Sequence, residues 1–113
     1  MTQNYIVPIP LGTIDVTTIT AITWTAFDTG AIPGACFMLR ITNDSDSDIF
    51  ISYDGVGYHE YIASGDRIEI NFQTNSSPSG YVSKVKKGTI LYVQGEVGQT
   101  GNIYLAGYYN NNI

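Results

Sequence analysis

The sequence is poor in charged residues, has one cysteine and one histidine, and contains no long hydrophobic run. Charged side chains make up 13% of it, against about 25% in an average soluble domain. The single cysteine, Cys36, excludes an intramolecular disulfide, and its apolar surroundings (ACFMLRI) predict a buried core thiol. The single histidine excludes a zinc site built from several histidines. No segment approaches the roughly 20 apolar residues of a membrane-spanning helix.

Basic residues are scarcer than acidic ones, at five against ten, which gives a formal net charge of −5. The basic cluster comprises Lys84, Lys86 and Lys87, and affinity for a phosphate backbone comes from such clusters. One short cluster in an acidic chain leads us to expect neither nucleic acid nor an anionic membrane surface as a partner. The opening residues MTQNYIVPIPLG lack the basic start and apolar stretch of a secretory signal, which predicts that the chain is made and folded in a cytoplasm.

Strand formers dominate what is present, and apolar residues recur with a period of two rather than 3.6. RIEINFQ alternates from residue 67, FMLRI from residue 37 and DIFISYD from residue 48. Turn signals separate about eight such segments. The pattern predicts an all-β chain with one antiparallel β-sandwich of jelly-roll or Greek-key type, spanning residues 13–113. TILYVQG and NIYLAGYY are expected to form a hairpin through the glycine-rich EVGQTG.

Two segments near the N-terminus depart from a regular strand. Residues 1–12 contain Pro8 and Pro10, which predicts an extended arm that packs on a neighbouring subunit or forms an edge strand of its own domain. In TIDVTTITAITWTAFD the apolar phase switches near Thr17 and Thr18, which predicts a bulge or a bend between two strands. Trp24, further along this segment, is expected in the core.

The acidic stretch NDSDSDIFISYDG raises the question of a metal site. Asp44, Asp46 and Asp48 match the start of a calcium loop, but that loop needs Gly at its sixth position and Glu at its twelfth. Ile49 and Gly55 stand there instead. The pattern favours a polar turn whose Asn and Asp side chains bond to the backbone, and no cofactor. An irregular calcium site that adds Asp54 is the alternative.

Catalytic groupings are sparse. A small hydrolase using Asp54, His59 or Glu60 is one hypothesis, but no Gly-x-Ser-x-Gly elbow accompanies the histidine. We therefore expect that the protein is not an enzyme. Asp54-Gly55 is better explained as a tight turn between two strands.

Nine tyrosines supply most of the aromatic content. Tyrosine is favoured at protein interfaces because it carries a large contact area at low entropic cost. The tyrosines that we expect at interfaces are Tyr5, Tyr53, Tyr58, Tyr61, Tyr108 and Tyr109. A carbohydrate-binding site lined by Tyr53, Asp54, Tyr58 and His59 is the alternative use of such residues.

Three quoted segments carry a resemblance to a known group of proteins: ITNDSDSDIFISYDGVGYHEYIASGDRIEINFQTN, KKGTILYVQG and GNIYLAGYY. Over residues 36–109 the sequence resembles small β-sandwich virion structural proteins of tailed bacteriophages, of the head decoration, head fibre, connector or tail type. The resemblance lies in strands and turns, so no catalytic residue carries over. It implies a non-enzymatic virion protein, made in the host cytoplasm, that forms homo-oligomers and docks on the capsid or other virion proteins. A carbohydrate-binding module at a receptor-binding tip, with a glycan as partner, is the alternative function.

Overall fold

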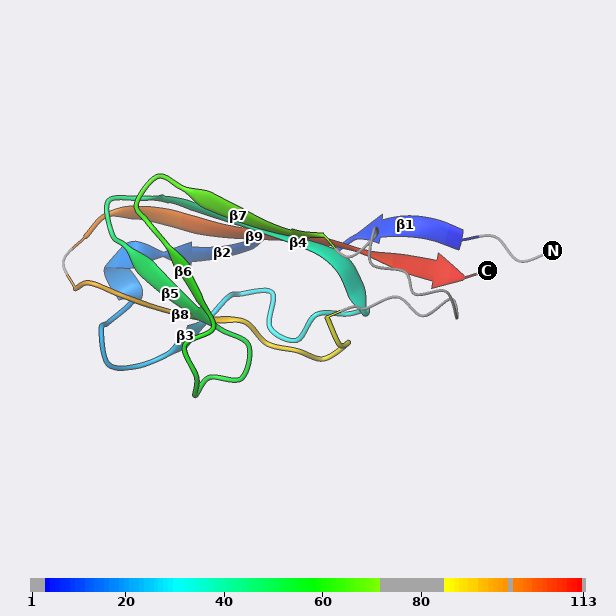
Figure 1. The fold of residues 1–113 in the computed structure, drawn as a ribbon, viewed down its shortest axis with the longest axis horizontal. Helices are drawn as coiled ribbons and strands as arrows, with labels where there is room; N and C mark the ends of the chain where they lie inside the picture. Colours follow the sequence, from blue (N-terminus) through cyan, green and yellow to red (C-terminus); the bar gives the residue numbers. More distant parts are fainter. Residues whose placement is uncertain (1–3, 72–84, 98, 113) are drawn as a thin grey trace.

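The strands form two antiparallel sheets in a computed structural model that describes residues 4–71, 85–97 and 99–112 (Figure 1). The first sheet contains β1 (Asn4–Pro8), β2 (Gly12–Asp15), β9 (Gly101–Asn112), β4 (Cys36–Ser45) and β7 (Arg67–Asn71). The second sheet contains β3 (Thr25–Ala26), β8 (Tyr92–Gly95), β5 (Ile49–Ser52) and β6 (Glu60–Ile62). The all-β antiparallel sandwich predicted from the sequence is confirmed.

The strands from β2 through β9 pair in the jelly-roll order, in which the first strand pairs with the last, the second with the last but one, and so on. β2 pairs with β9, β3 with β8, β4 with β7, and β5 with β6. The contacts β4–β9 and β5–β8 then join these pairs into the two sheets. Such an order makes the chain cross between sheets after almost every strand.

The core lies between the two sheets and is built by the inward phase of each strand. β4 buries Leu39 and Ile41, β5 buries Ile49 and Ile51, and Cys36 is also fully buried. Full burial of an Ile or Leu side chain stabilises a fold by roughly 1.5–3 kcal/mol. Inward and outward side chains alternate along β5 and β7 as predicted, and the Cys36 thiol is buried as predicted. Phe72 of the predicted strand RIEINFQ lies outside the described residues.

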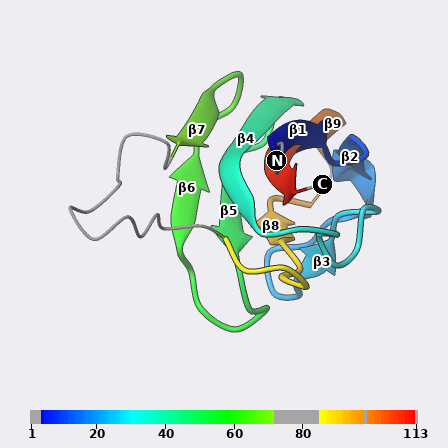
Figure 2. The ribbon, with the colours of Figure 1, turned by 90° about the vertical axis from the view of Figure 1, so that its right-hand side faces the viewer.

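The predicted hairpin between TILYVQG and NIYLAGYY is wrong. β8 belongs to the second sheet and β9 to the first, so the chain after Gly95 crosses between sheets (Figure 2). β9 instead pairs with β4 from Cys36↔Tyr109 to Ser45↔Gly101, with a register shift near its start. A glycine-rich connection permits either geometry, and this long-range ladder decides between them.

The break expected near Thr17, as a bulge or a bend between two strands, is a 3-10 helix at Val16–Thr18 that lies between β2 and β3. The Asp15 carboxylate caps this helix by accepting the Thr17 backbone N–H at 2.9 Å. Only two residues, Thr25 and Ala26, form the strand that follows. Within the described residues, no helix is long and apolar enough to cross a membrane.

The N-terminal segment is an edge strand of the chain's own first sheet. β1 pairs with the last five positions of β9, from Asn4↔Asn112 to Pro8↔Tyr108. The Ile9 backbone N–H then donates to the Gly107 carbonyl at 2.9 Å, which continues the edge into β2. Of the two arrangements left open by the sequence, the structure has the edge strand, and β1 and the end of β9 extend beyond the second sheet (Figure 1).

Three crossover turns meet at the opposite end of the sandwich: residues 46–48 after β4, residues 63–66 after β6, and the connection from β8 to β9. The side-chain amide of buried Asn43 links the first two, because its Nδ2 donates to the carbonyls of Ser47 (2.8 Å), Ile62 (3.2 Å) and Ala63 (3.2 Å). The side chain of Ser45 donates to Asn43 Oδ1. The Asn43 amide is thus the polar centre of this end of the fold.

Asp46 and Asp48 tie the same turns together from outside. Asp46 Oδ1 accepts the Thr100 backbone N–H at 2.7 Å, which links the first turn to the third. Asp48 Oδ1 accepts the Ser64 backbone N–H at 2.9 Å, which links the first turn to the second. Ser47 is fully buried, and its Oγ accepts the Glu96 backbone N–H at 3.1 Å. The acidic stretch is a polar turn that bonds to the backbone, as predicted, but its Asn43 and Ser47 are buried.

Asn43→Asp tests the role of the buried amide. The substitution replaces a double donor by an acceptor that faces three carbonyl oxygens, and unsatisfied buried polar groups cost about 1–3 kcal/mol each. We expect the free energy of unfolding, measured by urea denaturation, to fall by about 2–4 kcal/mol. The exposed Asn110→Asp change on β9 is the control and should cost less than about 0.5 kcal/mol. Equal losses in the two variants would contradict the linking role of Asn43.

Candidate aromatic and acidic binding face

The outer surface of the second sheet carries a row of four aromatic side chains: Trp24, Tyr58, Phe50 and Tyr61. Phe50 lies on β5 directly across from Tyr61 on β6 and from Gln94 on β8. Because side chains of paired residues project from the same face of a sheet, these three share the outer surface. Trp24 immediately precedes the first pair of the β3–β8 ladder, Thr25↔Val93. Tyr58 comes from the loop between β5 and β6.

Each ring of the aromatic row contacts the next. The ring centroids are 5.0 Å apart for Trp24 and Tyr58, 5.2 Å for Tyr58 and Phe50, and 5.4 Å for Phe50 and Tyr61. The corresponding interplanar angles are 54°, 85° and 52°. These are tilted and edge-to-face contacts, which aromatic rings prefer. The rings therefore form a ridged surface rather than a flat platform.

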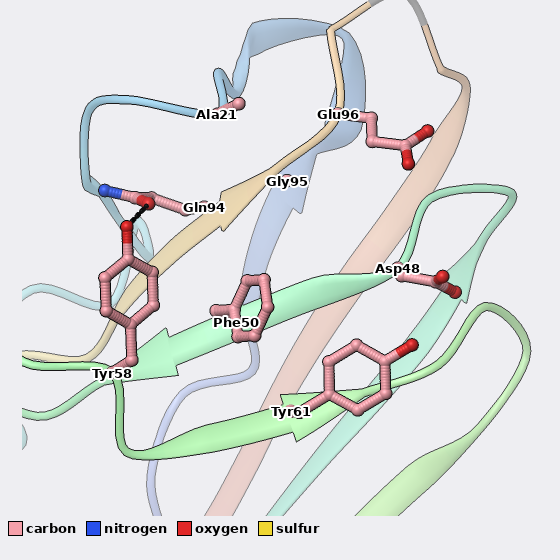
Figure 3. A pocket seen from close by; sticks show the side chains of 8 residues that line it. All are labelled: Ala21, Asp48, Phe50, Tyr58, Tyr61, Gln94, Gly95 and Glu96. Carbon is pink, nitrogen blue, oxygen red and sulfur yellow. Dashed lines mark hydrogen bonds between the residues drawn. The ribbon is translucent and has the colours of Figure 1, made fainter.

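The row is largely accessible to solvent. Tyr58 is 60% exposed, Tyr61 53% and Phe50 40%. Tyr58 is held in place by its hydroxyl, which donates to Gln94 Oε1 at 2.8 Å (Figure 3). The amide of Gln94 is itself buried. An ordered aromatic surface in water is typical of a site that a partner covers.

A pocket of about 260 Å³ lies along the row (Figure 3). Phe50 stands in its middle, Tyr58 and Gln94 at one end, and the carboxylates of Asp48 and Glu96 at the other. Ala21 and Gly95 complete the lining. A Cβ atom at Gly95 would come within 2.6 Å of Ile19 Cδ1 and 2.9 Å of Ser47 Oγ, so a larger residue there would displace these side chains.

Of the tyrosines predicted at interfaces, Tyr58 and Tyr61 belong to the aromatic row, whereas Tyr53 does not. Tyr53 is half-buried and packs against the core. Its burial, with a smaller contribution from the charge of Glu60, raises the pKa of its phenol to about 12. The pKa of Tyr61 is also raised, by partial desolvation, by its hydrogen bond with Asp48, and by the charges of Asp48, Asp66 and Glu96.

The remaining predicted interface tyrosines lie in the first sheet, away from the row. Tyr108 and Tyr109 are half-buried on β9, and Tyr109 packs against the core. A Cβ atom on Gly34 would lie 2.4 Å from the Tyr109 ring, so this ring also sets the path of the loop before β4. Tyr5 is on β1, opposite Asn111, and its side chain lies outside the described part of the chain.

The loop between β5 and β6 uses Asp54 as a turn residue. Asp54 Oδ1 accepts the backbone N–H groups of Val56 (2.8 Å) and Gly57 (3.0 Å) and the Ser52 hydroxyl (2.9 Å). These bonds, with the nearby His59, lower the pKa of Asp54 to about 2. Gly55 follows with a φ of +77°, which favours glycine. The tight turn expected at Asp54-Gly55 is present.

The other two residues of the hydrolase hypothesis are His59, in the same loop, and Glu60, at the start of β6. His59 Nδ1 accepts the Tyr53 backbone N–H at 3.0 Å, and the imidazole stacks on the Tyr53 ring at 5.5 Å. Glu60 is in β6, opposite Ile51. The oxygen Oδ1 of Asp54 is occupied by the turn.

The four carboxylates of the calcium hypothesis do not converge. Asp46, Asp48 and Asp54 each accept a backbone N–H from a different turn, at Thr100, Ser64 and Val56 respectively. Asp44 is exposed on β4. Among the described residues, no group of three or more His, Cys, Asp or Glu side chains has the spacing to hold a metal ion.

Several residues of the site were not predicted. Trp24 was expected in the core but is only half-buried and caps one end of the aromatic row. The sequence does contain a signal for Phe50, because it is an aromatic residue among the outward-facing positions of DIFISYD. Gln94 and Glu96 have no local signal, because only the pairing of β8 with β5 brings them to this face.

Comparison with known proteins adds no family to these observations. No protein-family model matches the chain, and no curated protein matches it significantly. The resemblance to phage virion proteins therefore stays a prediction.

The low pKa of Asp54 predicts a specific pH dependence. A carboxylate whose pKa is about 2 in the folded chain, below its ordinary value of 3.8, stabilises the fold above pH 4, and this stabilisation is lost as the pH falls to 2. We expect the side-chain carboxyl of Asp54 to titrate near pH 2 by NMR. The stability difference between the wild type and Asp54→Asn should shrink over the same interval, whereas an Asp44→Asn control reports the effect of net charge alone. A titration midpoint near 4 would contradict the turn geometry.

Proposed function

We propose that this chain is a non-enzymatic virion structural protein that docks on other virion proteins, itself included, through the aromatic row. The observation that carries the proposal is the mutually packed row of Trp24, Tyr58, Phe50 and Tyr61 on the outer face of the second sheet, of which all but the half-buried Trp24 are exposed. Aromatic residues concentrate in the centres of protein interfaces. The strand-and-turn resemblance supports the virion setting.

The chemistry of the described polar residues also favours a surface function. Asp46, Asp48 and Asp54 are engaged by backbone N–H groups that hold turns, and His59 Nδ1 holds the Tyr53 backbone. These side chains stabilise loops. The aromatic row, in contrast, makes a small contribution to the core and leaves large apolar areas in water.

Docking by the row can be tested with Phe50→Thr combined with Tyr61→Thr, which keeps strand propensity while removing two rings. Truncating aromatic anchors that a partner buries costs more than about 1 kcal/mol each. The affinity of the double variant for its docking site should therefore fall at least roughly tenfold, which lowers its incorporation. The measurement is quantitative mass spectrometry of purified particles, which counts copies per virion for wild type and variant. Val56→Thr is the control, because Val56 is exposed but outside the row.

Three outcomes decide the proposal. Reduced copies of the Phe50/Tyr61 variant, with normal copies of the control, would support docking through the row. Wild-type levels of the double variant would refute the role of the row. Absence of the wild-type chain from the particle would refute the virion proposal altogether.

A carbohydrate-binding module is the second candidate, favoured by the carboxylates and the Gln94 amide beside the rings. Sugars bind by stacking on aromatic faces, and the 52–85° tilts between neighbouring rings suit this less well than a flat platform. We expect glycan arrays to show no binding above background. A hit that is lost in Tyr61→Ala and kept in Val56→Thr would move this candidate to first place.

A further inference from the structure

The two carboxylates at the acidic end of the pocket favour a positively charged ligand. Asp48 and Glu96 each lie one residue beyond the Ile49↔Gly95 pair that ends the β5–β8 ladder, and their carboxylates lie at the same end of the pocket (Figure 3). Both are exposed and both line the pocket. Two like charges at the same end of a pocket repel each other, and a cation placed between them relieves that repulsion.

No basic side chain of the described chain supplies that cation. The pocket lining contains no lysine or arginine. The pKa of Tyr61, raised by partial desolvation and by the charges of Asp48, Asp66 and Glu96, reflects the negative potential at this end. An external cation is therefore attracted both by two carboxylates and by the faces of neighbouring rings.

Hydrogen-bonding capacity narrows the ligand further. Ionised carboxylates only accept hydrogen bonds. The Tyr58 hydroxyl donates to Gln94 Oε1, and the Gln94 amide nitrogen points away from the two carboxylates (Figure 3). The carboxylates of Asp48 and Glu96 thus offer acceptors to a ligand that is rich in donors. A guanidinium group has five N–H donors and no acceptor, whereas a sugar hydroxyl needs both.

We propose that the pocket between Phe50, Tyr61, Asp48 and Glu96 receives the guanidinium of an arginine side chain from the protein on which this chain docks. The planar group stacks on an aromatic ring while its N–H donors reach the carboxylates. The inference rests on the proposed docking function and names the chemistry of the partner. It assigns to Asp48 and Glu96 a binding role in addition to the structural bond of Asp48 to Ser64.

The test uses the full chain and Nα-acetyl-arginine N-methylamide as the probe, followed by amide ¹H–¹⁵N NMR shifts. We expect saturable shifts at Asp48, Tyr61 and Glu96, with affinity about tenfold weaker in Asp48→Asn/Glu96→Gln, because each exposed charge pair contributes up to about 1 kcal/mol. The control Asp44→Asn/Glu69→Gln has the same net charge but leaves the pocket lining intact, and should bind within about twofold of wild type. The citrulline analogue, which is uncharged, should not bind.

Binding of the citrulline analogue equal to that of the arginine probe, or an unchanged affinity in Asp48→Asn/Glu96→Gln, would overturn the inference. So would the absence of saturable shifts at these residues, or saturable shifts with a methyl glycoside alone. Counting both variants in particles separates this failure from that of the proposed function. If Asp48→Asn/Glu96→Gln is incorporated like wild type while Phe50→Thr/Tyr61→Thr is not, docking stands and the arginine site fails; if both are incorporated normally, the row is not the docking surface.

Discussion

The hydrogen bonds that join the crossover turns are the constraint on which the rest of this structure depends. A jelly-roll order sends the chain from one sheet to the other after almost every strand, and each crossing leaves backbone groups that no ladder satisfies. The buried Asn43 amide accounts for three such carbonyls. Asp46, Ser47 and Asp48 supply acceptors for the facing N–H groups. Hydrogen bonds of polar residues therefore hold the turns together at this end, as apolar packing holds the two sheets together in the core.

The same turns determine where the two carboxylates lie on the aromatic face. Because the first crossover ends at Asp48 and the third begins at Glu96, the two carboxylates are placed at the end of the β5–β8 ladder, next to Phe50 and Gln94. Asp48 thus has two faces: Oδ1 holds the Ser64 backbone, and the carboxylate as a whole lines the pocket. In the proposed arginine site, one residue thus serves both the turn and the ligand.

A fold whose loop acids are engaged by backbone N–H groups, and which leaves Phe50, Tyr58 and Tyr61 exposed, is suited to binding. The loop acid Asp54 is held ionised by backbone donors, and His59 braces the same loop. The aromatic row with its acidic end is available to a partner. This combination favours a docking role and links two predictions, an aromatic contact and a cationic group on the partner.

The sequence by itself determined the fold class, the inward phases of β4, β5 and β7, the buried Cys36 and the turn at Asp54, because alternation and turn chemistry are local. It was silent or wrong where distant segments decide. Whether β8 pairs with β9 or with β5, and whether Trp24 lies in the core or on the surface, depends on competition among ladders that bring residues 24, 50 and 94 together. Only the tertiary structure brings Asp48 and Glu96 to one end of the pocket, since strand neighbours are fixed by register and not by position along the chain.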